Sequence, residues 1–126
     1  MVRAAREQDL PRILTIYNVA RRYMRAHGNT AQWVNGYPSE ELLRQDLAAG
    51  QLYVLEDGGG VYAVFAFILG EDPTYRRIRG AWQDDSPYGT IHRLASAGKR
   101  PGVATDVINW CLEHCESLRA DTHADN

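Results

Sequence analysis

The part of this chain best suited to chemistry is a short loop between a predicted strand and a predicted helix. The strand runs from Tyr88 to Ser96, the helix from Val103 to Cys115, and the loop carries the pattern Lys99-x-x-Gly102-x-Ala104. Small residues at a helix start leave backbone N–H groups accessible, and the aligned peptide dipoles add partial positive charge there. This combination favours binding of a phosphate or diphosphate group. An ordinary strand-to-helix turn can carry the same Gly-x-Ala spacing, so the elements around the loop must decide.

The composition predicts one small globular domain over residues 1–126. The chain has 126 residues, 44% of them hydrophobic and 24% charged, which is typical of a folded domain with its own core. The net charge of −2 gives no bulk attraction to nucleic acid or anionic lipid. The longest apolar run, Val61 to Leu69, is too short to cross a bilayer, and the N-terminus lacks the apolar segment of a signal peptide. We therefore expect a cytoplasmic protein with no nucleic-acid and no membrane partner.

The two cysteines, Cys111 and Cys115, lie one helical turn apart on the apolar stripe of the last predicted helix. That spacing is poor for a disulfide, and together with His114 and His123 it is poor for zinc. We expect free thiols in the core and no metal site.

Hydrophobic periodicity and turn chemistry predict the element order β-α-α-β-β-β-α-β. The expected elements are strand Val2–Ala5, helix Glu7–Ala26, helix Glu40–Ala49, strands Gln51–Glu56, Val61–Leu69 and Tyr88–Ser96, helix Val103–Cys115 and strand Leu118–Thr122. The chain is therefore of the α/β (α+β) class, with a mixed, mostly antiparallel sheet flanked by helices. The last two strands should be parallel neighbours because a helix connects them.

Local signals support these bounds. Ser39 is expected to cap the second helix, and Asp57-Gly-Gly-Gly60 is expected to form the turn of a hairpin. The polar and aromatic segment from Gly70 to Pro87 is a long loop, and loops of that length are often functional.

This element order and the Lys99 loop resemble the GNAT family of N-acetyltransferases. The acyl-CoA loop of that family has the pattern Gln/Arg-x-x-Gly-x-Gly/Ala; Lys99 stands where Gln or Arg is usual, and Gly102 and Ala104 match. Further stretches similar to bacterial members are Tyr37–Glu41, Gly70–Tyr75, Ile91–Ser96 and Leu118–Asn126. The resemblance spans nearly the whole chain and implies a GNAT-like acyl-CoA acyltransferase fold.

Three departures from the family pattern bear on this expectation. Pro101 removes one backbone N–H from the loop, and Asp106 places a negative charge in the first turn of the helix. Family members also continue with a fourth helix, two strands and often a tyrosine that protonates the CoA thiolate. We expect a C-terminally truncated domain in which Leu118 and Ala120 belong to an exposed edge strand, an arrangement compatible with a homodimer.

The resemblance implies transfer of an acetyl group from acetyl-CoA, as co-substrate, to an amine of a small molecule or peptide. The backbone N–H near Leu94 is the expected oxyanion donor. The residues expected to contact acetyl-CoA are Leu94, Ala95, Ser96, Lys99, Arg100, Gly102, Val103, Ala104, Thr105 and Asn126.

The attacking amine must lose a proton, and His92 is the first candidate base because imidazole titrates near neutral pH. An alternative is that His92 is only a hydrogen-bonded strand residue. Strand alternation puts His92 and Arg93 on opposite faces. Carboxylates of the long loop could instead act through water; they are Glu71, Asp72, Asp84 and Asp85.

Loop aromatics are expected to bind the acceptor, since aromatic rings line many small-molecule sites and can hold a cationic amine. They are Trp33, Tyr37, Tyr75 and Trp82; alternatively they only cover the core. A non-catalytic acyl-CoA-binding or protein-interaction module with the same fold is the alternative function.

Overall fold

The computed structural model describes residues 1–26, 37–69, 88–98, 101–115 and 117–120. Its elements are β1 (Val2–Ala4), a 3₁₀ turn η1 (Glu7–Asp9), α1 (Leu10–Ala26), α2 (Glu40–Ala48), β2 (Leu52–Asp57), β3 (Gly60–Leu69), β4 (Tyr88–Ser96), α4 (Val103–Leu112) and β5 (Ser117–Ala120). The predicted element order is confirmed, and the bounds of β4 agree with the prediction at both ends.

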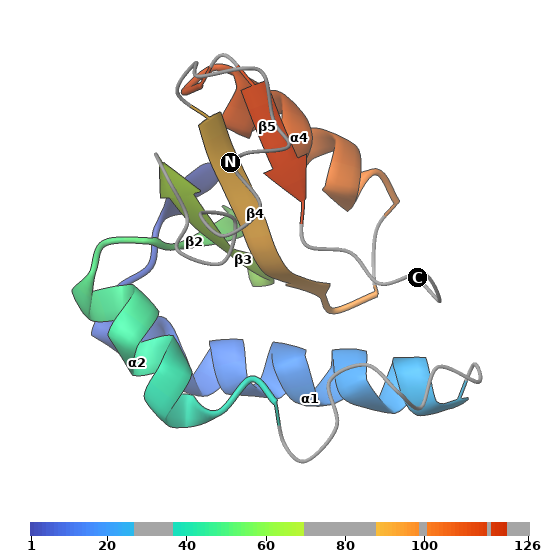
Figure 1. The fold of residues 1–126 in the computed structure, drawn as a ribbon. Helices are drawn as coiled ribbons and strands as arrows, with labels where there is room; N and C mark the ends of the chain where they lie inside the picture. Colours follow the sequence, from blue (N-terminus) through green and yellow to red (C-terminus); the bar gives the residue numbers. More distant parts are fainter. Residues whose placement is uncertain (27–36, 70–87, 99–100, 116, 121–126) are drawn as a thin grey trace.

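The strands form one sheet with the order β1-β2-β3-β4-β5. Neighbouring strands are antiparallel from β1 to β4, whereas β5 runs parallel to β4 (Figure 1). The predicted mixed, mostly antiparallel sheet is confirmed. The parallel pair follows from the crossover through α4, which returns the chain to the same edge of the sheet.

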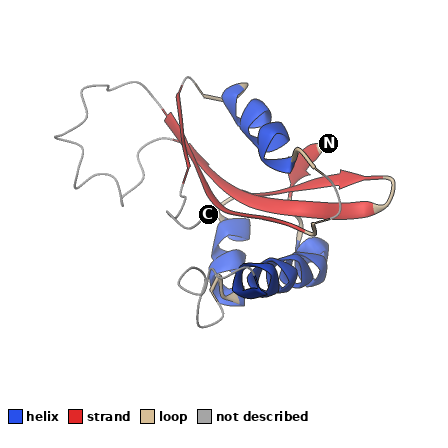
Figure 2. Cartoon of the chain, turned by 90° about the vertical axis from the view of Figure 1, so that its right-hand side faces the viewer, coloured by secondary structure: helices blue, strands red, loops and turns tan. Residues whose placement is uncertain are grey.

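Helices cover both faces of the sheet (Figure 2). On one face, α1 and α2 bury Ile13, Tyr17 and Leu43 against the sheet. On the other face, α4 buries Val107 and Cys111 in a second cluster. Each face of the sheet therefore has its own apolar core, and β4 contributes residues to both.

The second core contains Cys111, which the sequence analysis placed on the apolar stripe of α4. Cys111 is fully buried and Cys115 half-buried, and both are free. Burial raises the pKa of the Cys111 thiol to about 12, because the thiolate is poorly solvated there.

Gly89 packs against the same region: a Cβ at this position would lie 2.4 Å from Cε1 of Phe67. A larger residue at position 89 would therefore force the Phe67 ring or the β4 main chain to shift.

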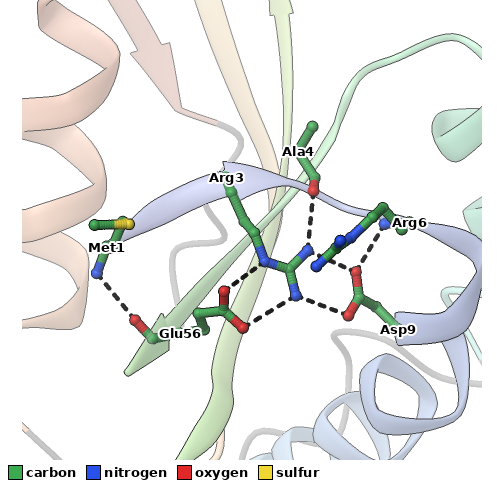
Figure 3. A network of polar contacts seen from close by, with 6 residues as sticks. All are labelled: Met1, Arg3, Ala4, Arg6, Asp9 and Glu56. Atoms are coloured by element: carbon green, nitrogen blue, oxygen red, sulfur yellow. Dashed lines mark hydrogen bonds and ion pairs between the residues drawn. The ribbon is translucent and has the colours of Figure 1, made fainter. Parts of the chain in front are cut away.

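Arg3 joins the first strand to its neighbours (Figure 3). Its guanidinium contacts the carboxylates of Asp9 at 2.8 Å and of Glu56 at 2.8 Å. The Asp9 carboxylate also accepts a 2.7 Å hydrogen bond from the backbone N–H of Arg6. The helix predicted from Glu7 thus begins as the η1 turn, which this carboxylate closes, and becomes α-helical only at Leu10.

The ends of the other helices differ little from the prediction. Ser39 caps α2, its hydroxyl accepting a 3.1 Å hydrogen bond from the N–H of Leu42. The last helix ends at Leu112 rather than Cys115 because its final turn tightens. The N–H of His114 donates to the carbonyl three residues back, at 2.9 Å. Among the described residues, no helix combines the length and apolar character needed to cross a membrane.

Candidate functional site

The main feature of the candidate site is the edge of β4 that extends past β5. The parallel pairing with β5 covers four residues of β4, Tyr88 to Ile91. Within the described part of the chain, nothing pairs with β4 on that side from His92 to Ser96, and Figure 1 shows β5 ending beside the middle of β4. Main-chain groups along this stretch can therefore accept an extended ligand as they would an added strand.

A bulge interrupts β4 within the same stretch. Val64 of β3 pairs with Ala95, but Ala66 pairs with His92, so two residues of β4 face a single residue of β3. One of the two, Arg93, has a φ of +56°. This left-handed conformation at the first bulge position is usually taken by glycine. The bulge leaves the regular hydrogen-bond ladder and turns the main chain at Arg93 and Leu94.

A buried polar cluster surrounds the bulge. The Arg93 guanidinium contacts the Asp46 carboxylate of α2 at 2.7 Å, and their side chains are only 10% and 8% exposed. The Arg93 carbonyl accepts a 2.6 Å hydrogen bond from the Tyr17 hydroxyl of α1. The Tyr37 hydroxyl lies 3.4 Å from Arg93 Nη1. Side chain and main chain of the bulge residue are thus both tied to the helical layer.

Electrostatics of the cluster favour a charged Arg93 and a neutral Tyr17. Burial acts to lower the pKa of Arg93, but the hydrogen bond with Tyr37 and the charge of Asp46 outweigh burial and raise it. Burial raises the pKa of the Tyr17 phenol well above its usual range. Among the described residues, the Nε of Arg93 and the hydroxyl of Thr90 are buried without a hydrogen-bond partner.

The bulge corrects the expectation that His92 and Arg93 face opposite sides of the sheet. Ile91 packs in the core beneath α4, so alternation places His92 on the opposite face, toward α1 and α2. The bulge then sends the Arg93 side chain to Asp46 on that same face. The alternation rule was wrong here because a left-handed residue interrupts the pleat. His92 itself is 8% exposed.

The chain leaves β4 through a short loop that opens α4. Two glycines of this loop, Gly98 and Gly102, have φ values of +77° and +78°, and a Cβ on either would meet no atom within 4 Å. Gly102 is the N-cap of α4, and its carbonyl accepts the first helical hydrogen bond, from the N–H of Asp106 at 3.0 Å. The backbone N–H groups of the first turn of α4 have no acceptor within the helix. The helix end thus offers N–H donors and open space, as diphosphate binding requires.

Two of the three departures noted in the sequence, Pro101 and Asp106, concern this helix end and leave it usable. Pro101 is exposed and precedes the N-cap, so its missing N–H lies outside the first turn of α4. Asp106 is exposed rather than buried beneath the turn. Three amides, of Val103, Ala104 and Thr105, remain as donors in that turn.

Most of the predicted acetyl-CoA contacts fall on these two features. Leu94, Ala95 and Ser96 end β4, Gly102 caps α4, and the next three residues form its first turn. The Ser96 hydroxyl accepts a 3.0 Å hydrogen bond from the N–H of Gly98, so its side chain shapes the loop. The predicted site residues that lie outside the described part of the chain are Lys99, Arg100, Asn126, Trp33, Tyr75 and Trp82, together with the alternative bases Glu71, Asp72, Asp84 and Asp85.

Sequence reasoning missed the buried cluster. Asp46 is 6% exposed and lies one turn after the buried Leu43, on the apolar face of α2. An acidic residue on an apolar helix face indicates a buried partner, and this signal was available. The identity of the partner was not, because Arg93 reaches Asp46 only through the bulge. Among the residues that the structure describes, no group of acidic, histidine or cysteine side chains could hold a metal ion.

Comparison with known proteins supports the fold. No protein-family model matches the sequence, and no curated protein matches it. Among solved structures, a GNAT-family acetyltransferase from Streptococcus agalactiae 2603 superposes with a TM-score of 0.83 at 25% identity, covering 100% of this chain and 77% of the other. The chain adopts the GNAT fold.

Other solved structures with the GNAT fold are more distant. A putative acetyltransferase from Staphylococcus aureus Mu50 has a TM-score of 0.66 at 23% identity, covering 90% of this chain and 70% of the other. An aminoglycoside antibiotic 6′-N-acetyltransferase from Acinetobacter haemolyticus has a TM-score of 0.62 at 20% identity, covering 100% and 81%. At such identities the likeness concerns the GNAT fold, so the chemistry has to be argued from the site.

Proposed function

We propose that this chain is an acetyl-CoA-dependent N-acetyltransferase. The observation that carries the proposal is the edge of β4 from His92 to Ser96, with which no described strand pairs on the β5 side, followed within one short loop by the N-terminus of α4. An extended pantetheine arm and a diphosphate need these two features in this order. The GNAT fold of acetyltransferases supports the same reading.

Acetyl-CoA would be held mainly by backbone groups. The pantetheine arm would pair with main-chain groups of Leu94 and Ser96. The diphosphate would accept hydrogen bonds from the amides at the start of α4, where the helix dipole favours negative charge. Lys99 and Arg100, in the loop, would add positive charge, and Asn126 is a further proposed contact.

The reaction would proceed by direct attack in a ternary complex. The amine nitrogen forms a bond to the thioester carbon, the carbon–sulfur bond breaks, and CoA leaves as a thiolate. The backbone N–H at Leu94 is the proposed oxyanion donor. His92 is the proposed base that takes the proton from the amine, because it lies on the sheet face toward α1 and α2.

The acceptor would bind beside Tyr37, which precedes α2 and lies at the exposed rim of the buried cluster. Tyr37 supports this placement, since its hydroxyl lies 3.4 Å from Arg93 Nη1 at the bulge. Trp33, Tyr75 and Trp82 complete the proposed set of acceptor contacts. The amine would belong to a small molecule or a peptide.

Calorimetry with CoA and acetyl-CoA tests the binding site. The decisive variant is Gly102→Glu, which puts a carboxylate at the N-cap of α4. Its matched control is Gly50→Glu at the end of α2, where φ is +70° and a Cβ also meets no atom within 4 Å. Both variants carry the same backbone strain. We expect Gly102→Glu to abolish CoA binding and Gly50→Glu to preserve it; loss in both or in neither would contradict the site.

Thiol release from acetyl-CoA with a panel of amines tests the reaction. The panel includes aminoglycosides, because one structural neighbour is an aminoglycoside acetyltransferase, and peptides with a free N-terminus. For an amine that is acetylated, His92→Gln should lower kcat by roughly 100-fold. CoA binding without release for any amine would favour the non-catalytic module.

A further inference from the structure

The residue at the β4 bulge is anchored on two sides. The Arg93 guanidinium contacts Asp46 of α2 at 2.7 Å, and the carbonyl of Arg93 accepts a 2.6 Å hydrogen bond from Tyr17 of α1. Tyr17 is fully buried and Asp46 nearly so. Two helices therefore fix one residue of the sheet, one helix through its side chain and the other through its main chain.

This anchoring opposes the backbone preference of an arginine. A φ of +56° is unfavourable for any residue with a Cβ, and glycine is usual at such a bulge position. The Nε of Arg93 is also buried without a hydrogen-bond partner among the described residues. Strained backbone and an unsatisfied donor persist where the surrounding contacts over-determine them, and such positions cluster at functional sites.

The bulge lies where acyl transfer would require a fixed main chain. Leu94, the other bulge residue, carries the N–H proposed as the oxyanion donor, and β5 does not pair with β4 at this point. An error of about 1 Å in such a donor can cost roughly 100-fold in rate. Because a bulge disrupts the regular ladder locally, the contacts of Arg93 with Asp46 and Tyr17 add a restraint that the ladder does not give there.

We propose that Arg93 is a positioning residue for acyl transfer. Its contacts with Asp46 and Tyr17 hold the bulge so that the main chain at Leu94 meets the thioester carbonyl of acetyl-CoA. This inference rests on the proposed acetyltransferase function. Arg93 acts through Leu94 and does not itself touch the reacting atoms.

The inference predicts a selective change in ligand affinity. CoA has the diphosphate and the pantetheine arm but no acetyl carbonyl. Loosening the bulge should therefore weaken acetyl-CoA binding, which would use both the thioester contact and the pantetheine pairing at Leu94, more than CoA binding, which would use the pairing alone. A general loss of stability would weaken both ligands together, or neither.

Tyr17→Phe is the cleanest variant, because it removes one hydroxyl and keeps the buried ring. Asp46→Asn keeps the shape of the Arg93 partner and removes its charge. We expect either variant to raise the calorimetric Kd of acetyl-CoA by about fivefold, the value of one hydrogen bond, while the Kd of CoA changes by less than about twofold. Where an amine substrate is found, kcat should fall in the same variants with little change in the KM for that amine.

Two comparisons separate positioning from stability. Asp9→Asn weakens the distant Arg3 network and should leave the ratio of the two Kd values unchanged. Arg93→Gly removes the anchor but suits the left-handed backbone. If the side chain of Arg93 positions the bulge, Arg93→Gly should raise the Kd of acetyl-CoA relative to the Kd of CoA, even though the backbone strain at this position is relieved.

Different experimental results would overturn the proposed acetyltransferase function and the proposed role of Arg93. A wild-type protein that binds neither CoA nor acetyl-CoA overturns the proposed function, and the inference with it. A wild-type protein that binds both, with an unchanged Kd ratio in Tyr17→Phe, overturns the role of Arg93 alone. Should Asp46→Asn fail to fold, Tyr17→Phe still gives the answer.

Discussion

Arg3 and Arg93 show two uses of the same side chain. Arg3 lies at a partly exposed edge and contacts two carboxylates, and each of its guanidinium nitrogens donates at least one hydrogen bond (Figure 3). Arg93 is buried, contacts one carboxylate, leaves its Nε without a partner among the described residues, and has a left-handed backbone. The Arg3 network is satisfied and unstrained, whereas the Arg93 network is neither.

The difference agrees with the separate roles that we propose for the two networks. The Arg3 contacts join β1, β2 and η1, and nothing in their geometry departs from ordinary values. The Arg93 contacts cross from α2 to the open part of β4, at the proposed acyl-transfer site. Local rules are broken where function imposes its own geometry and are obeyed where only folding is at stake.

The largest expected effect is on the buried pair. Asp46→Ala leaves the Arg93 charge buried without its carboxylate, so we expect a loss of about 3–5 kcal/mol in the free energy of unfolding. Urea denaturation followed by circular dichroism measures it. The double variant Asp46→Leu with Arg93→Met removes both charges and should recover most of the loss. A double variant as unstable as Asp46→Ala would show that the cost does not come from the unpaired charge.

A smaller effect is expected at the edge. Asp9→Asn keeps an acceptor oxygen but loses the charge that Arg3 contacts at 2.8 Å, so the free energy of unfolding should fall by about 1–2 kcal/mol. The same urea experiment gives the value. A loss equal to that of Asp46→Ala would remove the contrast between the two networks.

Acid should weaken the Arg3 network. The hydrogen bond from Arg3 lowers the pKa of Asp9, and another from Arg3 lowers that of Glu56. Each carboxylate stabilises the fold fully above its unfolded pKa, about 4, and this contribution is lost as pH falls through the lower folded value. Stability of the wild type should therefore fall as the pH drops below about 4. The fall should be shallower in Asp9→Asn, and parallel curves would contradict this assignment.

The smallest effect is expected at the exposed ion pairs of Arg44, which serve as the reference for the Arg3 and Arg93 networks. Arg44 contacts Glu7 at 3.1 Å and Glu40 at 3.0 Å, but all three side chains are half or more exposed. Solvent and salt screen such pairs. Arg44→Gln should leave the urea midpoint unchanged, and a clear drop would mean that exposed pairs matter more in this fold than burial suggests.

The sequence alone predicted the elements and their order. Apolar residues at helical and strand spacing, the Ser39 cap and the turn before Gly60 are local signals, and local signals do not depend on the rest of the fold. The start of α4 at Val103, directly after Gly102, was predicted for the same reason. These features provide the frame of the proposed acetyl-CoA site.

Only the tertiary structure brought Tyr17, Asp46 and Arg93 together. They come from α1, α2 and β4, and each contact with Arg93 joins residues 47 or more positions apart in the sequence. They meet because a bulge interrupts the alternation of side chains that sequence reasoning assumes. A bulge depends on the balance between strand pairing and side-chain anchoring across layers. Sequence patterns record the preferences of each segment, whereas the folded chain decides which of those preferences is overruled.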